Sequence, residues 1–325
     1  MAIHLILVCF LAVLGICPGA EGQGLRKVHV AIPAVSPAST TFVVAKDRGY
    51  YREEGLEVEM IVMPSAIATQ ALIGGNVKFT TVGGAGLPPI LRGASLRFLF
   101  TTFNRPMFWL YAKPEIRSVP DLKGKRIGVS SLGSGPDSLL RDLLKKHGID
   151  GGREVFIMPM GSGIARFAAL KAGSVDASML SIPSNFMAQE AGFRELLSFI
   201  EQEWVELQGS VLASEQLLES DPVLVEKFLR AGLKGFRYFR DNRSGTIVIL
   251  TRFLRIKEDL VGQIYDLIRP GMTQDGVIGE ALQKKSLEHI VERVGVKGPP
   301  PLEKIFDFSL TRKIRDELQV KGWRP

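Results

Sequence analysis

The chain has 325 residues, 46% of them hydrophobic and 23% charged, and its formal net charge is +7. This is the composition of a folded globular protein with room for about two domains. Basic residues are interleaved with acidic ones, as in 252–259 and 311–317, and they form no basic stripe with aromatic residues, so we expect no nucleic-acid binding. The mild basic excess fits an anionic ligand or an ordinary solvated surface.

The first 22 residues are predicted to be a signal peptide. Ile3–Ile16 is almost entirely apolar but too short for a confident membrane span, which is typical of the hydrophobic part of an export signal. Ala20–Gly22 offers a small-x-small cleavage site, so the mature chain is expected to start near Gln23. No Lys or Arg precedes the apolar run, which leaves an upstream start codon open. Cys17 could carry a lipid anchor, but the bulky Ile16 before it favours soluble export to the periplasm.

Both cysteines, Cys9 and Cys17, lie in this leader, so the mature chain has no disulfide, cysteine nucleophile or cysteine-based metal site. The four histidines are far apart and show no metal-binding spacing. Gly128–Gly133 has the glycine spacing of a phosphate-binding loop, but Ser134 stands where such a loop needs lysine. We therefore expect no catalytic residue, no metal and no cofactor.

Strands and helices alternate along the first two thirds of the chain, which predicts an α/β fold. Apolar alternation and turn residues predict strands at 28–32, 56–62, 78–82, 96–101, 107–112, 126–129, 155–158, 176–180 and 210–213. Helical spacing predicts helices at 42–48, 65–73, 87–91, from 136 onward, and at 164–172. From Val223 to Val294 the pattern is mostly helical, with Asp221 as the cap and Pro222 at the first position. A short amphipathic helix follows in the tail.

A weak internal repeat indicates that the α/β units form two similar lobes. Ala71–Val77 resembles Ala169–Val175, at an offset of 98 residues, and each reads as a helix end, a glycine stop and the entry to a strand. The strand-loop-helix units that begin at Val28 and Arg126 have the same offset. This spacing predicts two similar lobes in tandem.

The run of small residues from Ser130 to Gly135 is the clearest candidate for ligand contact. It joins a strand to a helix whose start is marked by Pro136. Backbone N–H groups of a loop with so little side-chain bulk can approach a ligand closely, and the first N–H groups of the helix lack internal partners. The alternative is an ordinary strand-to-helix turn, which is common in α/β proteins.

Three motifs in this order resemble a known family. Gly49–Val58, which contains the triplets G-Y-Y and E-G-L, is similar to the signature after the first helix of extracytoplasmic solute-binding proteins of ABC importers. Asp121–Val129 resembles the entry to their second lobe, and Ala169–Ala177 resembles a later motif. The branch is the aliphatic-sulfonate, taurine and nitrate type, which includes binders of pyrimidine precursors. One position departs from the pattern, because Lys78 stands where an acidic residue is usual.

The resemblance implies a type II periplasmic-binding-protein fold, with two α/β lobes, a hinge and a ligand cleft between the lobes. It implies a first lobe from residues 23–113 and 208–325 and a second lobe from 114–207, joined by crossovers near 112–119 and 203–209. It also implies a monomer that captures a small polar or anionic organic ligand, which is sulfonate-, nitrate- or pyrimidine-like. The lobes close around that ligand and present it to an ABC permease and its ATPase.

The family's ligand loops follow the strands that face the cleft, and the matching residues here are small or carry a hydroxyl. The residues implied are Ser36, Ser39, Thr40, Gly83, Gly84, Ala85, Ser130, Ser131, Gly133 and Ser134, with Ser162 and Ser181 as weaker additions. Such neutral donors suit an oxyanion or a polar head that needs no partner cation. Each single serine is also compatible with a turn or a cap. Trp109, Phe108 and Tyr111 are more simply strand core than a stacking platform, and Arg105 has no predicted orientation.

Two alternatives come from other functional classes. Pyrimidine synthase and chorismate dehydratase share this fold and are enzymes, but the leader argues against both. The synthase also resembles a cytosolic protein with a cysteine cluster, which the mature chain lacks. A sensor that presents its ligand to a membrane receptor is a further alternative to transport.

Overall fold

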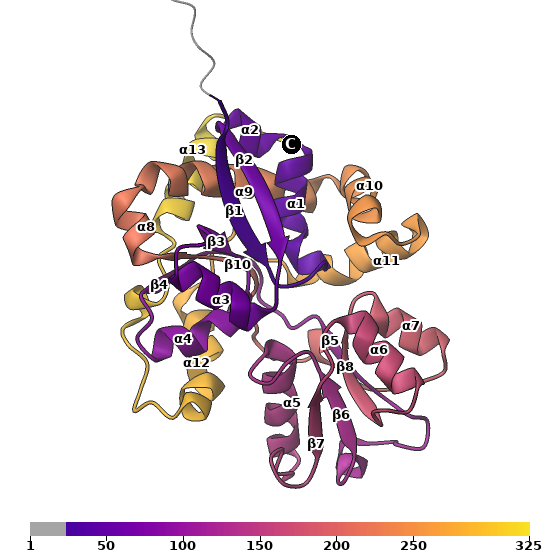
Figure 1. The fold of residues 1–325 in the computed structure, drawn as a ribbon. Helices are drawn as coiled ribbons and strands as arrows, with labels where there is room; N and C mark the ends of the chain where they lie inside the picture. The colour runs from indigo at the N-terminus through magenta and orange to yellow at the C-terminus, as the bar shows by residue number, and fades with distance from the viewer. Residues whose placement is uncertain (1–23) are drawn as a thin grey trace, which may run out of the picture.

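A computed structural model describes residues 24–325 of the chain. The predicted signal peptide and both cysteines lie outside the described residues. Two five-stranded sheets divide the rest into an upper lobe and a lower lobe in Figure 1, and both ends of the described chain lie in the upper one, lobe 1. No helix within 24–325 is long and apolar enough to cross a membrane.

Lobe 1 is built on a mixed sheet in the order β2-β1-β3-β10-β4. Its strands are β1 (Arg26–Ile32), β2 (Leu56–Val62), β3 (Phe79–Thr80), β4 (Leu96–Phe103) and β10 (Gln208–Ser214). β1 pairs in parallel with β2 and β3, whereas β10 runs antiparallel to β3 and β4. The predicted alternation in β1 is present, because Val28 and Val30 point into the core and are at most 1% exposed.

Most helices belong to lobe 1. They are α1 (Thr40–Asp47), α2 (Tyr50–Glu53), α3 (Ser65–Ile73), α4 (Leu87–Leu91), α8 (Glu215–Ser220), α9 (Pro222–Asp241), α10 (Arg243–Leu254), α11 (Glu258–Ile268), α12 (Glu280–Val294) and α13 (Ser309–Val320). α9 begins as predicted, because the Asp221 side chain accepts a hydrogen bond from Leu224 N at 3.1 Å. It packs against α1 and α13, and its Phe228 stacks on Phe79 of β3 with ring centroids 3.9 Å apart.

Lobe 2 repeats the same sheet order with β7-β6-β8-β5-β9. Its strands are β5 (Phe108–Ala112), β6 (Arg126–Val129), β7 (Phe156–Pro159), β8 (Ala177–Ser181) and β9 (Arg194–Ser198), and its helices are α5 (Gly135–Lys146), α6 (Gly163–Lys171) and α7 (Ser184–Glu190). β6 is parallel to β7 and β8, as β1 is to β2 and β3. The sequence repeat therefore corresponds to two lobes of the same design, in which α3 and α6 begin at Ser65 and Gly163.

Two crossovers connect the sheets. The chain leaves lobe 1 after β4 and enters lobe 2 at β5 through residues 104–107, and it returns through residues 202–207 to β10. The first boundary, predicted after residue 113, is wrong by one strand, because β5 pairs with β8 and β9 rather than with lobe 1. The corresponding crossover, predicted near 112–119, lies at 104–107 for the same reason. The strand itself was predicted at the correct place, but its sheet depends on partners far along the chain.

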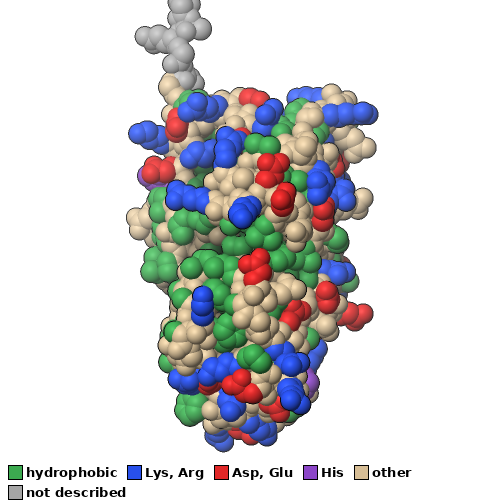
Figure 2. All heavy atoms as spheres, turned by 90° about the vertical axis from the view of Figure 1, so that its right-hand side faces the viewer, with side chains coloured by type: hydrophobic (Ala, Val, Ile, Leu, Met, Phe, Trp, Pro, Cys, Tyr) green, Lys and Arg blue, Asp and Glu red, His purple; other side chains and the backbone are tan. Residues whose placement is uncertain are grey.

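The two lobes share apolar contacts near the crossovers. One continuous hydrophobic cluster includes Phe103 at the end of β4, Met107 in the first crossover, Trp109 of β5 and Ile182 after β8. Figure 2 shows hydrophobic side chains in a band across the middle of the molecule, between the charged surfaces of the lobes. Burial of the apolar cluster near the crossovers holds the lobes together.

Candidate functional site

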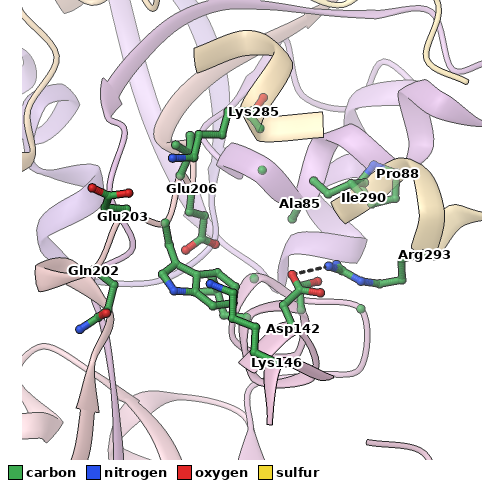
Figure 3. Close-up of a pocket in the computed structure, with 18 residues that line it drawn as sticks. Ala85, Pro88, Asp142, Lys146, Gln202, Glu203, Glu206, Lys285, Ile290 and Arg293 are labelled. Atoms are coloured by element: carbon green, nitrogen blue, oxygen red, sulfur yellow. Dashed lines mark hydrogen bonds and ion pairs between the residues drawn. The ribbon is translucent and has the colours of Figure 1, made fainter. Parts of the chain in front are cut away.

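A cavity of about 420 Å³ lies between the lobes, beside the second crossover (Figure 3). Lobe 1 contributes Gly84, Ala85, Pro88, Lys285, Ser286, Ile290 and Arg293, lobe 2 contributes Gly133, Gly135, Ser138, Leu139, Asp142 and Lys146, and the crossover contributes residues 202–206. The lobe 1 residues come from α12 and from the segment of η2 (Gly83–Gly86) and α4, and the lobe 2 residues come from α5 and the loop before it. A volume of this size is enough for a small organic molecule.

Glu206 of the second crossover brings a carboxyl group to the start of α5. A Cβ placed on Gly135, the first residue of that helix, would collide with Glu206 Oε1, so the glycine makes room for the acid. Gln208 Nε2 donates a hydrogen bond to Glu206 Oε2 at 3.0 Å. The side chain keeps some solvent contact through the cavity, but both lobes enclose its carboxyl group. Burial therefore raises the pKa of Glu206 from an ordinary 4.5 to about 7, and donation from Gln208 opposes part of this rise.

This arrangement changes the chemistry expected at the start of α5. The helix start was predicted to be open to an oxyanion, whereas the protein's own carboxyl group lies against it. A ligand group close to Glu206 is therefore favoured if it can donate a hydrogen bond or carries positive charge.

Cationic side chains surround the same cavity. Lys146 Nζ lies 4.2 Å from the centre of the Trp204 ring, an arrangement that stabilises a cation over an aromatic face. In Figure 3, Lys285 lies on the opposite side of Glu206 from Lys146. The acidic side chain of Glu206 and the basic side chains of Lys146 and Lys285 thus line one cavity, which suits a ligand with more than one polar group.

Two ion pairs join α5 of lobe 2 to α12 of lobe 1 at the cavity rim. Arg293 Nη2 lies 2.9 Å from Asp142 Oδ2, and these side chains are 27% and 17% exposed. Lys145 Nζ lies 2.6 Å from Glu292 Oε1, but both of these side chains are more than two-thirds exposed. Because solvent screens the second pair, the Arg293–Asp142 pair contributes more to holding the lobes in this relative position.

Three of the residues implied by the family resemblance line the cavity, namely Gly84, Ala85 and Gly133. Gly83 lies beside them with φ +61°, and a Cβ there would collide with Leu207 O of the crossover. The next residue fixes this contact, because Gly84 N donates to Leu207 O at 2.7 Å. The glycines after β3 therefore allow the loop to approach the crossover backbone, which is the role that needs glycine here.

The hydroxyl groups of the Ser130–Ser134 loop bond mainly to one another. Ser130 Oγ donates to Ser134 Oγ at 2.8 Å, and Ser134 Oγ donates to Ser131 O at 2.6 Å. Gly133 N donates to Asp137 Oδ2 at 2.7 Å, which fixes the loop at its left-handed glycine. The loop is thus held rigid at the cavity wall, with Gly133 rather than the serine hydroxyls lining the cavity.

The remaining implied residues lie at strand carboxyl ends but outside the cavity lining. Ser36 precedes η1 (Pro37–Ser39), and Ser39 Oγ donates to Ala34 O at 3.3 Å. Thr40, the first residue of α1, is fully buried. Ser162 caps α6 by accepting from Ala165 N at 3.2 Å, and Ser181 ends β8.

Trp109 and Tyr111 of β5 are core, as predicted, whereas Phe108 is half-buried. Trp109 is 4% exposed and Tyr111 is 2% exposed, and Tyr111 Oη donates to Glu195 Oε2 at 2.7 Å. Arg105 lies in the first crossover and donates from Nη1 to Ile200 O at 3.4 Å, away from the cavity lining. Within residues 24–325 no cluster of three or more His, Cys, Asp or Glu side chains could hold a metal ion.

Trp204, Glu206 and the residues of α12 were not predicted from the sequence as part of the site. A lone acid between apolar neighbours in a predicted crossover, as in W-V-E-L at 204–207, was a usable signal for Glu206. Lys285 and Arg293 gave no such signal, because α12 reaches the cavity only through packing against α4.

The two-lobed fold and the cavity between its lobes define a protein of the periplasmic-binding-protein class. The family model described as NMT1/THI5 like matches residues 36–244, and the chain belongs to this family. The family resemblance and the type II fold are thereby confirmed. No curated protein sequence matches the chain.

Several solved structures share the fold over nearly the whole of both chains. A protein from Bordetella bronchiseptica RB50 has a TM-score of 0.81 at 19% identity, covering 90% of this chain and 98% of that one. The periplasmic aliphatic sulphonate binding protein SsuA from Escherichia coli has a TM-score of 0.67 at 19% identity, covering 88% and 99%. The desulfurization enzyme DSZB has a TM-score of 0.67 at 16% identity, covering 90% and 99%. Binding proteins and an enzyme thus share this fold, so function has to be argued from the site.

Proposed function

We propose that the protein is an extracytoplasmic solute-binding protein, which captures a small polar or anionic organic molecule between its lobes and delivers it to an ABC importer. The observation that carries this proposal is the cavity of about 420 Å³, whose walls come from both lobes and from a crossover. A ligand held there contacts lobe 1 and lobe 2 at once, so its binding energy favours the closed arrangement.

Buried hydroxyl groups at the strand ends of both lobes support a polar ligand. Thr40 Oγ1 and Thr81 Oγ1 in lobe 1 and Ser184 Oγ in lobe 2 are buried and have no hydrogen-bond partner among the described residues. An unsatisfied buried hydroxyl costs about 1–3 kcal/mol, so such groups are expected where a ligand or water completes the bond. Thr81 and Ser184 lie just after β3 and β8, and Thr40 begins α1, the helix that follows β1, so each lies beyond the carboxyl end of a strand with a parallel neighbour, where α/β proteins bind ligands.

A thermal-shift screen of residues 23–325 tests the proposal. The panel contains alkanesulfonates, taurine, nitrate, aromatic carboxylates and pyrimidines, each at a concentration far above a micromolar Kd. A ligand at 100 times its Kd stabilises the folded state by about 2.7 kcal/mol, which raises the Tm of a protein of this size by several degrees. We expect a clear shift with one chemical class, and isothermal titration should then give one site per chain.

Two other results would each contradict part of the proposal in a different way. Turnover of the stabilising compound, followed by mass spectrometry, would assign the chain to the enzymes that share this fold. If no compound of the panel raises the Tm, the proposal of a small polar or anionic ligand is contradicted. The remaining alternative is then a sensor whose ligand lies outside the panel.

A further inference from the structure

Arg166 is a buried cation without a counter-charge. It lies on α6 and is 3% exposed, and its Nε donates to Met179 O at 2.6 Å while Nη1 donates to Gly161 O at 2.5 Å. Nη2 reaches Ser181 Oγ at 3.5 Å. No carboxylate of residues 24–325 forms an ion pair with it, and burial by itself lowers its pKa to about 10. At neutral pH the guanidinium therefore stays charged, and only neutral oxygen atoms compensate its charge.

An arrangement of this kind is costly unless an anion binds nearby. A charge removed from water loses several kcal/mol of solvation, and carbonyl oxygens return only part of it. A guanidinium can donate five hydrogen bonds, and the described residues accept three from Arg166. An anion brought close to it supplies the missing charge in a low-dielectric setting, where the attraction is strong.

Two serine hydroxyls lie beside the start of α6. A Cβ placed on Gly163, the first residue of this helix, would lie 2.8 Å from Ser181 Oγ and 2.9 Å from Ser184 Oγ. Ser184 is fully buried and its Oγ has no partner among the described residues. Ser162 Oγ accepts a hydrogen bond from Ala165 N, whereas the N–H groups of Gly163 and Ile164 have no partner within the helix and carry partial positive charge. The two serine hydroxyls, the start of α6 and the Arg166 guanidinium therefore lie close to one another.

This point faces lobe 1. β6, β7 and β8 are parallel, so their carboxyl ends share one edge of the sheet. The loop after β6 lines the cavity with lobe 1. On the same edge, Gly163 follows β7, Ser181 ends β8 and Ser184 follows it. In Figure 1, α6 and α7 lie on the side of lobe 2 below α10 and α11 of lobe 1. Gly161 and Ser162 are exposed, so the start of α6 is open to solvent.

We propose that the start of α6 is an oxoanion subsite, in which Ser181, Ser184 and the N–H groups of Gly163 and Ile164 bind a carboxylate or sulfonate head and Arg166 provides the counter-charge. The proposal rests on the proposed solute-binding function and makes it more specific, because it assigns the anionic head of the solute to lobe 2. Glu206 disfavours that head at the start of α5. The two helix starts of lobe 2 therefore differ in the charge that they accept.

The test measures the affinity of residues 23–325 for two pairs of probes by isothermal titration. Butanesulfonate is compared with neutral butanesulfonamide, and benzoate is compared with neutral benzamide. The variants are Ser184→Ala, which breaks no hydrogen bond of the described protein, Arg166→Lys and Arg166→Gln. Thr251→Val is the matched control, because Thr251 Oγ1 is also buried without a partner but lies on α10 of lobe 1.

The proposal expects at least one anion to bind and its neutral partner to bind at least about tenfold more weakly. Ser184→Ala should lower the affinity for that anion about 10- to 100-fold, the range for a hydrogen bond to a charged group, without lowering the Tm of the free protein. Arg166→Lys should retain more affinity than Arg166→Gln, and Thr251→Val should bind as the wild type does.

Two results would overturn the subsite and separate it from the proposed function. If Ser184→Ala binds the anion as tightly as the wild type, or if the neutral partner binds equally well, the subsite is wrong and the solute-binding function stands. If neither anion binds, the subsite is also rejected. The wider solute-binding function then depends on whether another compound of the thermal-shift panel, such as a pyrimidine, raises the Tm.

Discussion

Replacement of Glu206 by glutamine should make the protein more stable at neutral pH but not at acidic pH. The carboxyl group has a pKa of about 7 in the folded protein, against an ordinary 4.5, because it is buried between the lobes. A proton is therefore held more tightly in the folded state than in the unfolded state. As the pH rises from 4.5 to 7, the unfolded chain releases this proton first, so the wild type loses stability over that range.

The magnitude follows from the shift. One pKa unit corresponds to about 1.4 kcal/mol, so the full shift is worth about 3 kcal/mol, and solvent contact through the cavity reduces this to about 1–2 kcal/mol. Glutamine is neutral at every pH, so Glu206→Gln avoids this loss. We expect its free energy of unfolding, relative to the wild type, to rise by about 1–2 kcal/mol between pH 4.5 and pH 8.

The assay is urea unfolding of the wild type and Glu206→Gln at intervals from pH 4.5 to pH 8. Other titrating groups are common to both proteins, so they largely cancel in the difference. Glu203→Gln is the matched control, because Glu203 is an exposed acid on the same crossover. A difference between wild type and Glu206→Gln that does not change with pH would refute the reasoning that burial between the lobes perturbs this acid.

Three further substitutions test the fold and the contact between the lobes. Phe228→Ala removes the ring that stacks on Phe79 and should lower the free energy of unfolding by about 3–5 kcal/mol in urea titrations; a loss below about 1 kcal/mol would contradict its place in the core. Gly83→Ala combines a left-handed backbone with a collision at the crossover. Its Tm should fall clearly more than that of Gly75→Ala, which has φ +72° and open space around it; equal losses would mean that the crossover contact is unimportant. Arg293→Met should change the free energy of unfolding by less than about 1 kcal/mol but increase the radius of gyration in small-angle scattering, because the ion pair across the lobes is lost; unchanged scattering would show that the pair does not hold the lobes together.

Local sequence patterns predicted the elements well because their causes are local. The cap at Asp221, the start of α5 next to Pro136 and the glycine stop after α3 each depend on residues within a few positions. The repeat at an offset of 98 residues also followed from the sequence, because the same arrangement of helix end, turn and strand recurs in both lobes. The sheet to which β5 belongs could not be predicted from the sequence. Its membership depends on pairing with β8 and β9, which lie about 70 or more residues later.

The residues of the candidate site also differ in whether the local sequence indicates them. The family resemblance implied Gly84, Ala85 and Gly133 as ligand contacts, and these small residues after strands line the cavity. Arg166 and Ser184 gave no local signal: an arginine within a helix is usually exposed, and only the packing of α6 against β8 buries this one. Glu206 likewise becomes significant only when Gly135 of the other lobe is placed against it.

The central claim is that one ligand contacts both lobes, and hydrogen exchange with mass spectrometry tests it most directly. Exchange of residues 23–325 is measured with and without the compound that gives the largest thermal shift. The account predicts added protection in both lobes at once, in 83–86 of lobe 1 and in 130–135 and 161–166 of lobe 2. Protection confined to one lobe, or spread evenly over the chain, would contradict binding between the lobes.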